Sequence, residues 1–432
     1  MRGPSRRDGG RGGNAVRVLI IGMHYSPEVT GNAPYTAGLA EALAARGDAV
    51  TVVTGLPHYP AWRLAHGTPR RLLRLEHLHG VSLIRAAHYV PATQSAMRRV
   101  LYEGTFGLTG LLATIGMQHP DAILGIVPNL SSGIVARLTG SRLGVPYGLL
   151  FQNLLGPGAR QSGIAGGTTV AGLTAAAEVW AARGARAIGV VTDAFTTYLV
   201  SKGVPEQGIS HVPNWTHVAP AALTVEATRD RFGWTDGKQV VLHAGNMGVM
   251  QGLEQVVVAA RLAASRRDPI RFVLSGDGNQ ADAIRDLARD LDNLTFVCLQ
   301  PDGVYASMLA AADVLLVSER ETSIDMSLPS KLTSYFAAGR PIVAAVPRGG
   351  GSAREVGRSG AGIIVPAADP VRLLDALARL RAEPMLVSEL AAAGPAYAAT
   401  HTSATACLTR AVALVDAIAG AEPTRSTIGV AA

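Results

Sequence analysis

The residues best suited to bind an anion lie in one short segment of the second half of the chain, Leu328 to Val343. Ser330 is a favourable N-cap, and Lys331 opens a predicted helix that ends at Ala338. The free N–H groups and the dipole of a helix N-terminus attract negative charge, whereas a lysine there is otherwise unfavourable to the helix. We therefore predict a negatively charged ligand beside Lys331. The alternative is an exposed lysine near a helix cap.

Glycine-rich turns supply a second set of groups that phosphate could approach. The turn from Ala244 to Gly252 joins a predicted strand to a helix, and its glycines allow positive φ angles and close backbone approach. Ser275-Gly276-Asp277-Gly278 follows the next strand and could line the same place, although a simple tight turn explains it equally well. The G-x-G-x-x-G spacing is absent, so this is not a dinucleotide fingerprint.

Neither a metal site nor a hydrolytic nucleophile is predicted. Asp290 and Asp292 form a D-x-D pair, but they close a helical stretch and are typical of a solvated helix end. The histidines are scattered, and we find none with an i, i+4 His or Glu partner arranged for zinc. The G-x-S-x-G motif is absent. The two cysteines, Cys298 and Cys407, cannot form a disulfide framework and favour a reducing compartment.

Strands and helices that alternate along the chain would position these groups. The first half begins with a buried parallel strand, Val16–Gly22, a loop that contains Gly31, and a helix, Tyr35–Arg46, capped by Gly47. Further strands are predicted at Ala49–Thr54, Ala122–Ile126, Tyr147–Phe151 and Ile188–Val191. This pattern predicts a Rossmann-like α/β domain, an open parallel sheet with helices on its faces.

The second half repeats the pattern as another doubly wound α/β domain. Its strands are predicted at Val240–His243, Arg271–Leu274, Leu294–Val297, Val314–Val317, Ile342–Ala345 and Gly362–Val365. We expect a disordered tail (1–14), an N-terminal domain (15–218), a C-terminal domain (219–395), a helix returning towards the N-terminal domain (396–420) and a second tail (421–432). The carboxyl ends of both sheets would face a cleft between the domains, where ligands of open parallel sheets bind.

Composition and charge narrow the class of protein. The 432 residues are 48% apolar and 16% charged, which excludes a disordered protein, a coiled coil and a collagen-like fibre. No apolar stretch reaches the roughly 18 residues of a membrane span. Residues 1–220 carry 19 Lys and Arg against 10 Asp and Glu, whereas residues 221–432 carry 20 against 22. The basic first half indicates an anionic partner (nucleic acid, a phospholipid surface or a phosphorylated substrate) or simply an arginine-rich composition.

Taken together, these motifs resemble the retaining GT-B glycosyltransferases of family 4. The likeness extends from Val16 to Arg381 and is greatest to the colanic-acid and O-antigen branch, which builds exopolysaccharide repeat units from nucleotide sugars, often GDP-fucose or N-acetylfucosamine donors. It is carried by Tyr25-Ser-Pro-Glu-Val-Thr-Gly31 with Tyr35-Thr36, Leu56-Pro-His-Tyr-Pro60 with Trp62, Val212-Pro-Asn-Trp215, the Gly245 turn with Gln251-Gly252, and Leu328-Pro-Ser-Lys331 ahead of Gly339-Arg-Pro341.

The resemblance implies a GT-B fold, a C-terminal domain that binds the nucleotide sugar and an N-terminal domain that binds the acceptor. It implies a metal-independent hexosyltransferase without a cofactor, in which the departing phosphate takes the acceptor proton. The catalytic candidates are Lys331, Gly31 and Gln152. The donor-binding candidates are Gly245, Asn246, Gly248, Gln251, Gly276, Ser330 and Ser334. The acceptor-side candidates are Glu28, Thr30, Asn32, Tyr35 and His58.

Several positions depart from the family pattern. Asn246 and Gln251 stand where most members have an Arg and a Lys that grip the diphosphate, so Lys331 is the expected replacement. The two glutamates of the E-x7-E motif correspond to Met326 and Ser334, which leaves the usual ribose contact without its carboxylate. Gln152, at the position often held by histidine, can donate a hydrogen bond but cannot act as a base.

The basic residues of the first half suggest how an acceptor is reached. Arg70, Arg71, Arg74 and Arg98-Arg99 interleave with apolar residues, as in surface elements that dock on anionic lipid. We therefore expect a cytoplasmic enzyme, peripheral at the inner face of the plasma membrane, with a lipid-linked saccharide as acceptor. The alternatives are solvated arginines on a soluble enzyme, a nucleotide-sugar epimerase, and a non-catalytic nucleotide-sugar binder. Nucleic acid is not expected, because aromatic interleaving and recognised motifs are absent.

Overall fold

The computed structural model describes residues 15–28, 31–59, 61–64, 67–69, 71–93, 95–154, 167–216, 219–322 and 331–421. Thr30, Arg70, Met326, Ser330 and the tail 1–14, all named above, lie outside these residues. The chain divides into two compact units, which are described separately. Unit 1 comprises the chain up to Val212 together with the segment from Leu408, and unit 2 comprises Pro213–Cys407.

Unit 1 is built on an eight-stranded sheet in the order β3-β4-β2-β1-β5-β6-β7-β8. The strands are β1 (Arg17–Ile21), β2 (Ala49–Gly55), β3 (Leu73–Leu78), β4 (Val81–Ala86), β5 (Ala122–Val127), β6 (Tyr147–Phe151), β7 (Ala187–Val190) and β8 (Ile209–His211). All neighbours pair in parallel except the edge strand β3, which is antiparallel to β4. The predicted Rossmann-like sheet is confirmed, and β3, β4 and β8 are additions that the sequence reading missed.

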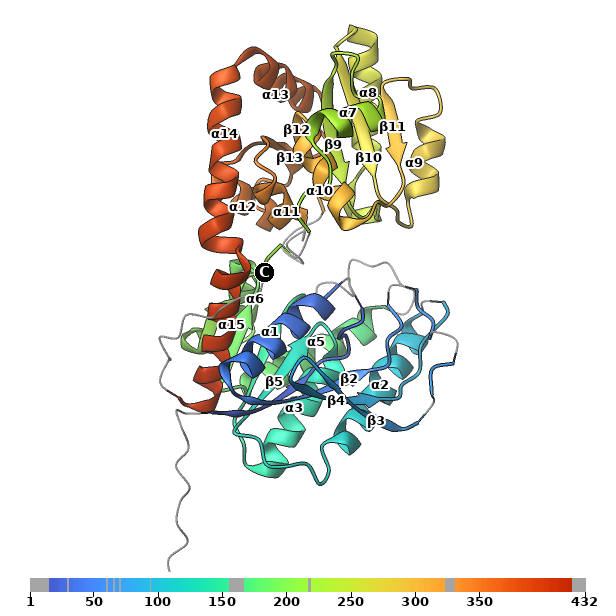
Figure 1. Cartoon of the computed structure of the whole chain (residues 1–432). Helices are drawn as coiled ribbons and strands as arrows, with labels where there is room; N and C mark the ends of the chain where they lie inside the picture. Colours follow the sequence, from blue (N-terminus) through green and yellow to red (C-terminus); the bar gives the residue numbers. More distant parts are fainter. Residues whose placement is uncertain are drawn as a thin grey trace, which may run out of the picture. The chain divides into compact units, whose positions relative to one another are not determined.

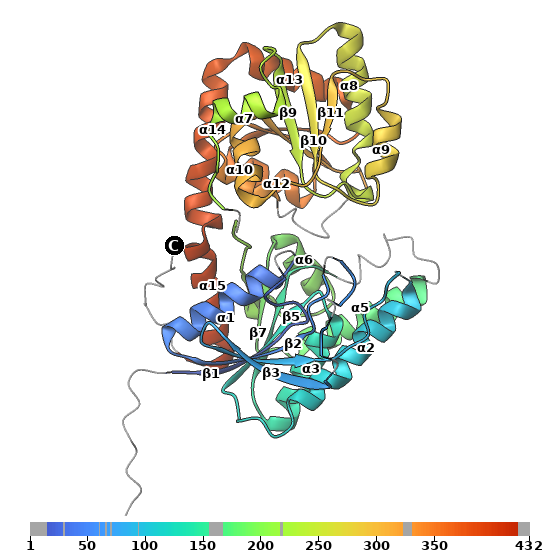
Figure 2. The ribbon, with the colours of Figure 1, turned by 45° about the vertical axis from the view of Figure 1, so that its right-hand side comes forward.

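Helices cover both faces of this sheet (Figures 1 and 2). They are α1 (Ala33–Arg46), α2 (Ala96–Ala113), α3 (Leu130–Leu143), α5 (Gly167–Arg183), α6 (Asp193–Ser201), the 3-10 turn η1 (Glu206–Gly208) and α15 (Ala404–Ala419). One core joins β1 and its neighbours to α2, α3, α5 and α6. Gly47, at φ +102°, ends α1 in the left-handed conformation predicted for a C-terminal cap.

The last helix, α15, lies beside α1, on the face of the unit 1 sheet that is opposite α2, α3 and α5 (Figures 1 and 2). Gly148 makes room for it, because a Cβ at this position would lie 2.3 Å from Cδ1 of Ile418. Both carboxylate oxygens of Asp416 accept from Nη1 of Arg46, at 2.8 and 2.9 Å. Asp416 is buried, so this ion pair fixes α15 to the end of α1.

Unit 2 contains a six-stranded parallel sheet in the order β11-β10-β9-β12-β13-β14. The strands are β9 (Gln239–Ala244), β10 (Ile270–Ser275), β11 (Leu294–Val297), β12 (Val314–Ser318), β13 (Ile342–Val346) and β14 (Gly362–Pro366). All six were predicted, each to within one residue at either end. The doubly wound α/β fold is thereby confirmed for both halves of the chain.

The helices of unit 2 are α7 (Val225–Phe232), η2 (Val249–Gln251), α8 (Glu254–Arg266), α9 (Ala281–Leu287), α10 (Asp302–Ala311), α11 (Lys331–Ala337), α12 (Gly351–Ser359), α13 (Pro370–Ala382) and α14 (Pro384–Tyr397). Alternate strand residues face two separate cores. Val241 of β9 packs with α8, α9 and α13, whereas Val240 and Leu242 pack with α10, α11 and α12.

One helical stretch, Pro384–Ala419, is long and apolar enough to cross a membrane, by its length and composition. It consists of α14, a π-helical turn η3 (Ala398–Thr402) and α15. Half of its most apolar part is buried inside the protein. Because α14 packs on α11 and α15 carries the buried Asp416, we interpret the stretch as packed core helices.

Candidate active site

Lys331, the first residue of α11, is buried at the carboxyl end of the unit 2 sheet. Its Nζ donates to Oε1 of Gln251 at 2.8 Å and contacts Nε2 of His243 at 3.1 Å. Burial lowers the pKa of Lys331 to about 7, and the nearby charge of Glu319 partly opposes this. The pKa of His243 also lies well below its usual value, because the imidazole is buried and faces the ammonium. Lys331 is therefore not the exposed lysine of the alternative interpretation.

The predicted glycine-rich turns meet beside this lysine. The register of the sheet pairs Ala244 with Ser275, so the turns that follow β9 and β10 begin at the same level. A Cβ on Gly245, at φ +139°, would lie 3.3 Å from Cε of Lys331, and one on Gly276, at φ +131°, would lie 2.0 Å from the Gly245 oxygen. Only glycine fits such close contact, so the two turns and the lysine form one compact group.

The other donor-side candidates of this region have different surroundings. Asn246 is exposed, and its amide lies against Gly248, whose added Cβ would be 2.9 Å from the Asn246 nitrogen. Oε1 of Gln251 accepts a hydrogen bond from Nζ of Lys331. Gln251 thus helps to position the Lys331 ammonium.

Ser334, where the family has a ribose-binding glutamate, is buried one turn after Lys331. Its hydroxyl donates to the Lys331 carbonyl at 3.0 Å and contacts the hydroxyl of Tyr305 at 3.2 Å. Both contacts are internal to unit 2. Ser334, which stands in place of the glutamate, thus links α11 to α10 through its contact with Tyr305.

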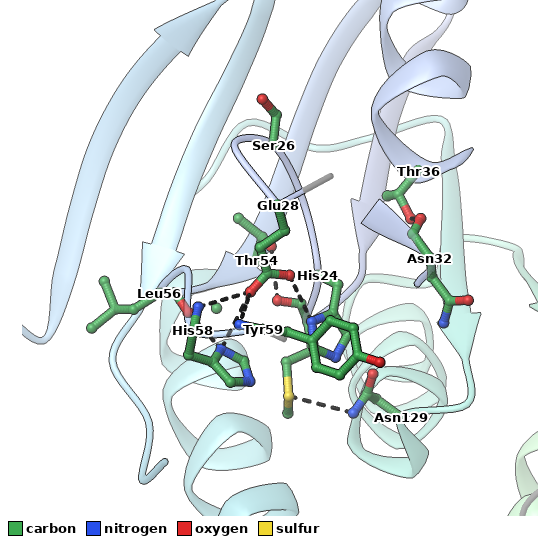
Figure 3. Close-up of polar contacts among 12 residues, drawn as sticks. His24, Ser26, Glu28, Asn32, Thr36, Thr54, Leu56, His58, Tyr59 and Asn129 are labelled. Carbon is green, nitrogen blue, oxygen red and sulfur yellow. Dashed lines mark hydrogen bonds and ion pairs between the residues drawn. The ribbon is translucent and has the colours of Figure 1, made fainter. Parts of the chain in front are cut away.

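A second group of candidates lies at the carboxyl end of the unit 1 sheet, in the loops after β1 and β2 (Figure 3). Oε1 of Glu28 accepts from the N–H groups of His58 and Tyr59, both at 2.8 Å, and Oε2 contacts Nδ1 of His24 at 2.7 Å. Burial would raise the pKa of Glu28, but these hydrogen bonds lower it below its ordinary value. The ionised carboxylate thus ties the two loops together.

The remaining candidates of unit 1 lie around the same edge of the sheet. Gly31, at φ +65°, packs against the ring of Tyr59. Asn32 precedes α1 and its carbonyl accepts from Thr36, while Tyr35 is buried in the first turn of that helix. Gln152 follows β6 and is also buried. The structure therefore brings Glu28, Gly31 and His58 into one cluster.

Sequence reasoning missed several residues that hold these sites. We expected no histidine to have an i, i+4 His or Glu partner arranged for zinc, yet His24 and Glu28 have this spacing and are in contact in a loop. Tyr102 of α2 contacts Nε2 of His58 at 2.9 Å. In unit 2, the Tyr335 hydroxyl accepts from the Ala244 N–H at 2.8 Å and so holds the end of β9. The i, i+4 spacing was visible in the sequence, whereas the tyrosine contacts span 44 and 91 residues.

Comparison with known proteins decides the family. Residues 30–215 match the model of the glycosyl transferase 4-like domain, and residues 238–383 match glycosyl transferases group 1. The putative colanic acid biosynthesis glycosyl transferase WcaI of Escherichia coli K12 is 32% identical over 337 residues, which cover 75% of this chain and 82% of that protein. The chain belongs to the family 4 glycosyltransferases. The probable glycosyltransferase WbjE of Pseudomonas aeruginosa is 32% identical over 149 residues, covering 33% of this chain and 37% of the relative.

Solved structures support the GT-B fold of this family 4 enzyme. Sucrose-phosphate synthase from Thermosynechococcus elongatus superposes with a TM-score of 0.70 at 19% identity, covering 92% of this chain and 98% of that one. Anabaena HepE in complex with UDP-glucose gives a TM-score of 0.65 at 15% identity, covering 94% and 98%. The predicted fold and the predicted class of enzyme, a glycosyltransferase, are thus confirmed.

Proposed function

We propose that this family 4 enzyme transfers a sugar, with retention of anomeric configuration, from a GDP- or UDP-linked donor to a lipid-linked saccharide in exopolysaccharide or cell-surface biosynthesis. One observation supports the donor site above all: the Lys331 ammonium is buried, and its described hydrogen-bond partners, Gln251 and His243, are neutral. The charge of Glu319 offsets only part of the cost of burial, so the ammonium still lacks compensating negative charge. A donor diphosphate beside the glycines of the Gly245 and Gly276 turns would supply it.

In the proposed reaction this site stabilises the leaving group, the nucleoside diphosphate. The acceptor hydroxyl oxygen bonds to the anomeric carbon from the face that the nucleotide leaves, while the bond from that carbon to the phosphate oxygen breaks. The nucleoside diphosphate departs with the electron pair, and its phosphate takes the hydroxyl proton. Lys331 would face the developing negative charge, so transfer is expected without a bound metal ion. Gly31 and Gln152 are proposed to act in catalysis, as the family resemblance implies.

The donor is proposed from the nucleotide sugars that are named for two similar proteins. HepE was solved with UDP and UDP-glucose, and the Corynebacterium relative, 25% identical over 175 residues, is a GDP-mannose-dependent mannosyltransferase. Thermal unfolding in the presence of GDP-, UDP- and dTDP-sugars identifies the donor, because a ligand that binds the folded state raises the transition temperature. Release of nucleoside diphosphate with polyprenyl-diphosphate-linked saccharides then tests transfer. No release with any donor and acceptor pair would contradict the proposal.

A membrane-bound acceptor is supported by the outer face of α2. Met97, Leu101, Leu108 and Leu112 are exposed and repeat at intervals of four, seven and four, so they form one apolar stripe along the helix. Arg98 is exposed beside it. We propose that this surface rests on anionic lipid at the cytoplasmic face of the plasma membrane.

Vesicle binding tests that surface. The protein should sediment with phosphatidylglycerol-containing vesicles, less so at high salt, and replacement of Leu101 and Leu108 by serine should weaken binding about tenfold or more. Leu173 on α5 is at least as exposed as these two leucines, so Leu173→Ser is the matched control. Equal binding to neutral vesicles, or unchanged binding of the double variant, would refute the assignment.

Turnover tests the proposed role of Lys331 directly. Lys331→Ala should abolish both sugar transfer and any slow hydrolysis of the donor. Unchanged turnover in this variant would contradict the role proposed for Lys331.

A further inference from the structure

The loops after β1 and β2 bring together two imidazoles and a carboxylate that the proposed sugar transfer does not require as a set. We propose that His24, Glu28 and His58 form a binding site for a divalent transition metal ion of the Zn²⁺ type. One ligand atom from each of the three residues can be chosen so that all lie within 4.8 Å of one another. The site goes beyond the proposed function, which assigns no metal ion to the transfer step.

The distances between the donor atoms are close to those that a metal ion requires. Donors bound at about 2.1 Å in tetrahedral geometry are about 3.4 Å apart. Nδ1 of His24 lies 2.7 Å from Oε2 of Glu28, and Nδ1 of His58 lies 3.5 Å from Oε1 of the same carboxylate. Figure 3 shows both rings directed at Glu28. Displacements of about 1 Å would make room for the ion.

The groups behind the ligands suit a metal site. Tyr102 Oη lies 2.9 Å from Nε2 of His58 and 3.4 Å from Nε2 of His24. When a metal ion takes both Nδ1 atoms, both Nε2 atoms carry hydrogen and can donate to this oxygen, which accepts two hydrogen bonds. Such an oxygen behind each metal-bound histidine orients the ring. In the metal-free arrangement the tyrosine hydroxyl can donate to only one of the two imidazoles.

The carboxylate is held in place independently of any metal ion. Oε1 of Glu28 accepts from the backbone N–H groups of His58 and Tyr59. Oε2 contacts only His24 among the described residues, and a metal ion would replace this contact. Nδ1 of His58 would likewise exchange its contact with the Leu56 carbonyl, at 2.8 Å, for the ion.

The donor set and the surroundings define the class of ion. Two imidazole nitrogens and one carboxylate oxygen suit Zn²⁺, Co²⁺ or Ni²⁺, whereas Mg²⁺ prefers oxygen ligands alone. Glu28 and His58 are nearly inaccessible, but the His24 side chain is 14% exposed and offers an approach for the ion. Three protein ligands leave coordination positions for water.

Co²⁺ is the probe that tests the site. The metal-free full-length protein should bind one equivalent with visible d–d bands, and excess Zn²⁺ should remove them. His24→Asn should weaken Co²⁺ binding at least tenfold, and Tyr102→Phe, which keeps all three ligands, by about tenfold. His79 contacts Glu41 at 2.8 Å on the surface without a third ligand, so His79→Asn is the matched control and should bind normally.

Circular dichroism establishes that each variant is folded. Stoichiometric Co²⁺ bands in His79→Asn but not in His24→Asn or Tyr102→Phe support the site. No bands in the wild type, or equal affinity in His24→Asn, would overturn it. A sulfur-to-cobalt charge-transfer band would also overturn it, because that assigns the ion to the exposed Cys298. Because this experiment measures metal binding, a negative result would refute the metal site without bearing on the proposed sugar transfer.

Discussion

Replacing Lys331 by methionine should make the protein more stable while it removes donor binding. The side chain is buried and the pKa of its ammonium falls from 10.5 to about 7, so the folded state disfavours the charge by up to about 5 kcal/mol, at 1.36 kcal/mol per pH unit. Methionine fills a similar volume without charge but forfeits the contacts with Gln251 and His243, worth about 1 kcal/mol each. We expect a net gain of about 2–3 kcal/mol in the free energy of unfolding at pH 6.

The stability difference between Lys331→Met and the wild type should depend on pH. Between about pH 7 and 10.5 the unfolded chain binds a proton at Lys331 that the folded protein does not, so wild-type stability rises with pH. This contribution is about 1.4 kcal/mol per pH unit, and the methionine variant lacks it. The advantage of the variant should therefore shrink above pH 7. Below pH 7 both states are protonated, and the difference is constant.

Urea unfolding at pH 6, 7.5 and 9, followed by fluorescence and circular dichroism, measures the difference through the transition of unit 2. Lys238→Met is the control, since Lys238 lies at the surface of the same unit and pairs with Asp236, and it should change stability by about 0.5 kcal/mol or less. A less stable Lys331→Met at pH 6, or a gap that does not narrow with pH, would refute the reasoning.

Donor binding should follow the same titration. Only the protonated form of Lys331 attracts a diphosphate. The affinity of the wild type for the donor should therefore fall about tenfold per pH unit once the pH exceeds about 7. Calorimetry in buffers of different ionisation enthalpy should show proton uptake on donor binding near pH 8. Binding by Lys331→Met as tight as that of the wild type would show that the diphosphate lies elsewhere.

Two further substitutions test the packing that supports the sites. Gly276→Ala places a Cβ 2.0 Å from the Gly245 oxygen at positive φ, so we expect a loss of about 3 kcal/mol in unfolding free energy and weaker donor binding, whereas Gly237→Ala, with positive φ but open space, should lose about 1 kcal/mol. Asp416→Asn leaves the Arg46 guanidinium without one of its two carboxylates and should lower the unfolding free energy of unit 1 by about 3 kcal/mol, measured by denaturant titration.

The parallel strands could be predicted because they are buried on both faces and form continuous apolar runs bounded by glycine. β6 was predicted without error for this reason. The hairpin of β3 and β4 was missed because β3 is an exposed edge strand whose Arg74, Glu76 and His77 interrupt the apolar pattern. Its position is decided by pairing with β4, which no local pattern encodes.

The sequence identified which residues form the candidate sites, but not how deeply they are buried or what they contact. A lysine after Pro329-Ser330 and glycines after strands are local signals, and they identified Lys331 and Gly245. The burial of Lys331 and its contact with His243, 88 residues away, depend on tertiary packing and could not be read from spacing. His24 and Glu28 share a loop, so the i, i+4 rule for helices did not single them out.

The return of α15 to unit 1 has a consequence for biosynthesis. Until Ile418 leaves the ribosome, the sheet surface at Gly148 lacks its covering helix, and Arg46 lacks Asp416. Unit 2, whose residues are contiguous from Pro213 to Cys407, can complete its core first. Unit 1, which begins the chain, therefore finishes folding last. A protein truncated between α14 and α15 would expose the apolar face of the unit 1 sheet to chaperones and proteases.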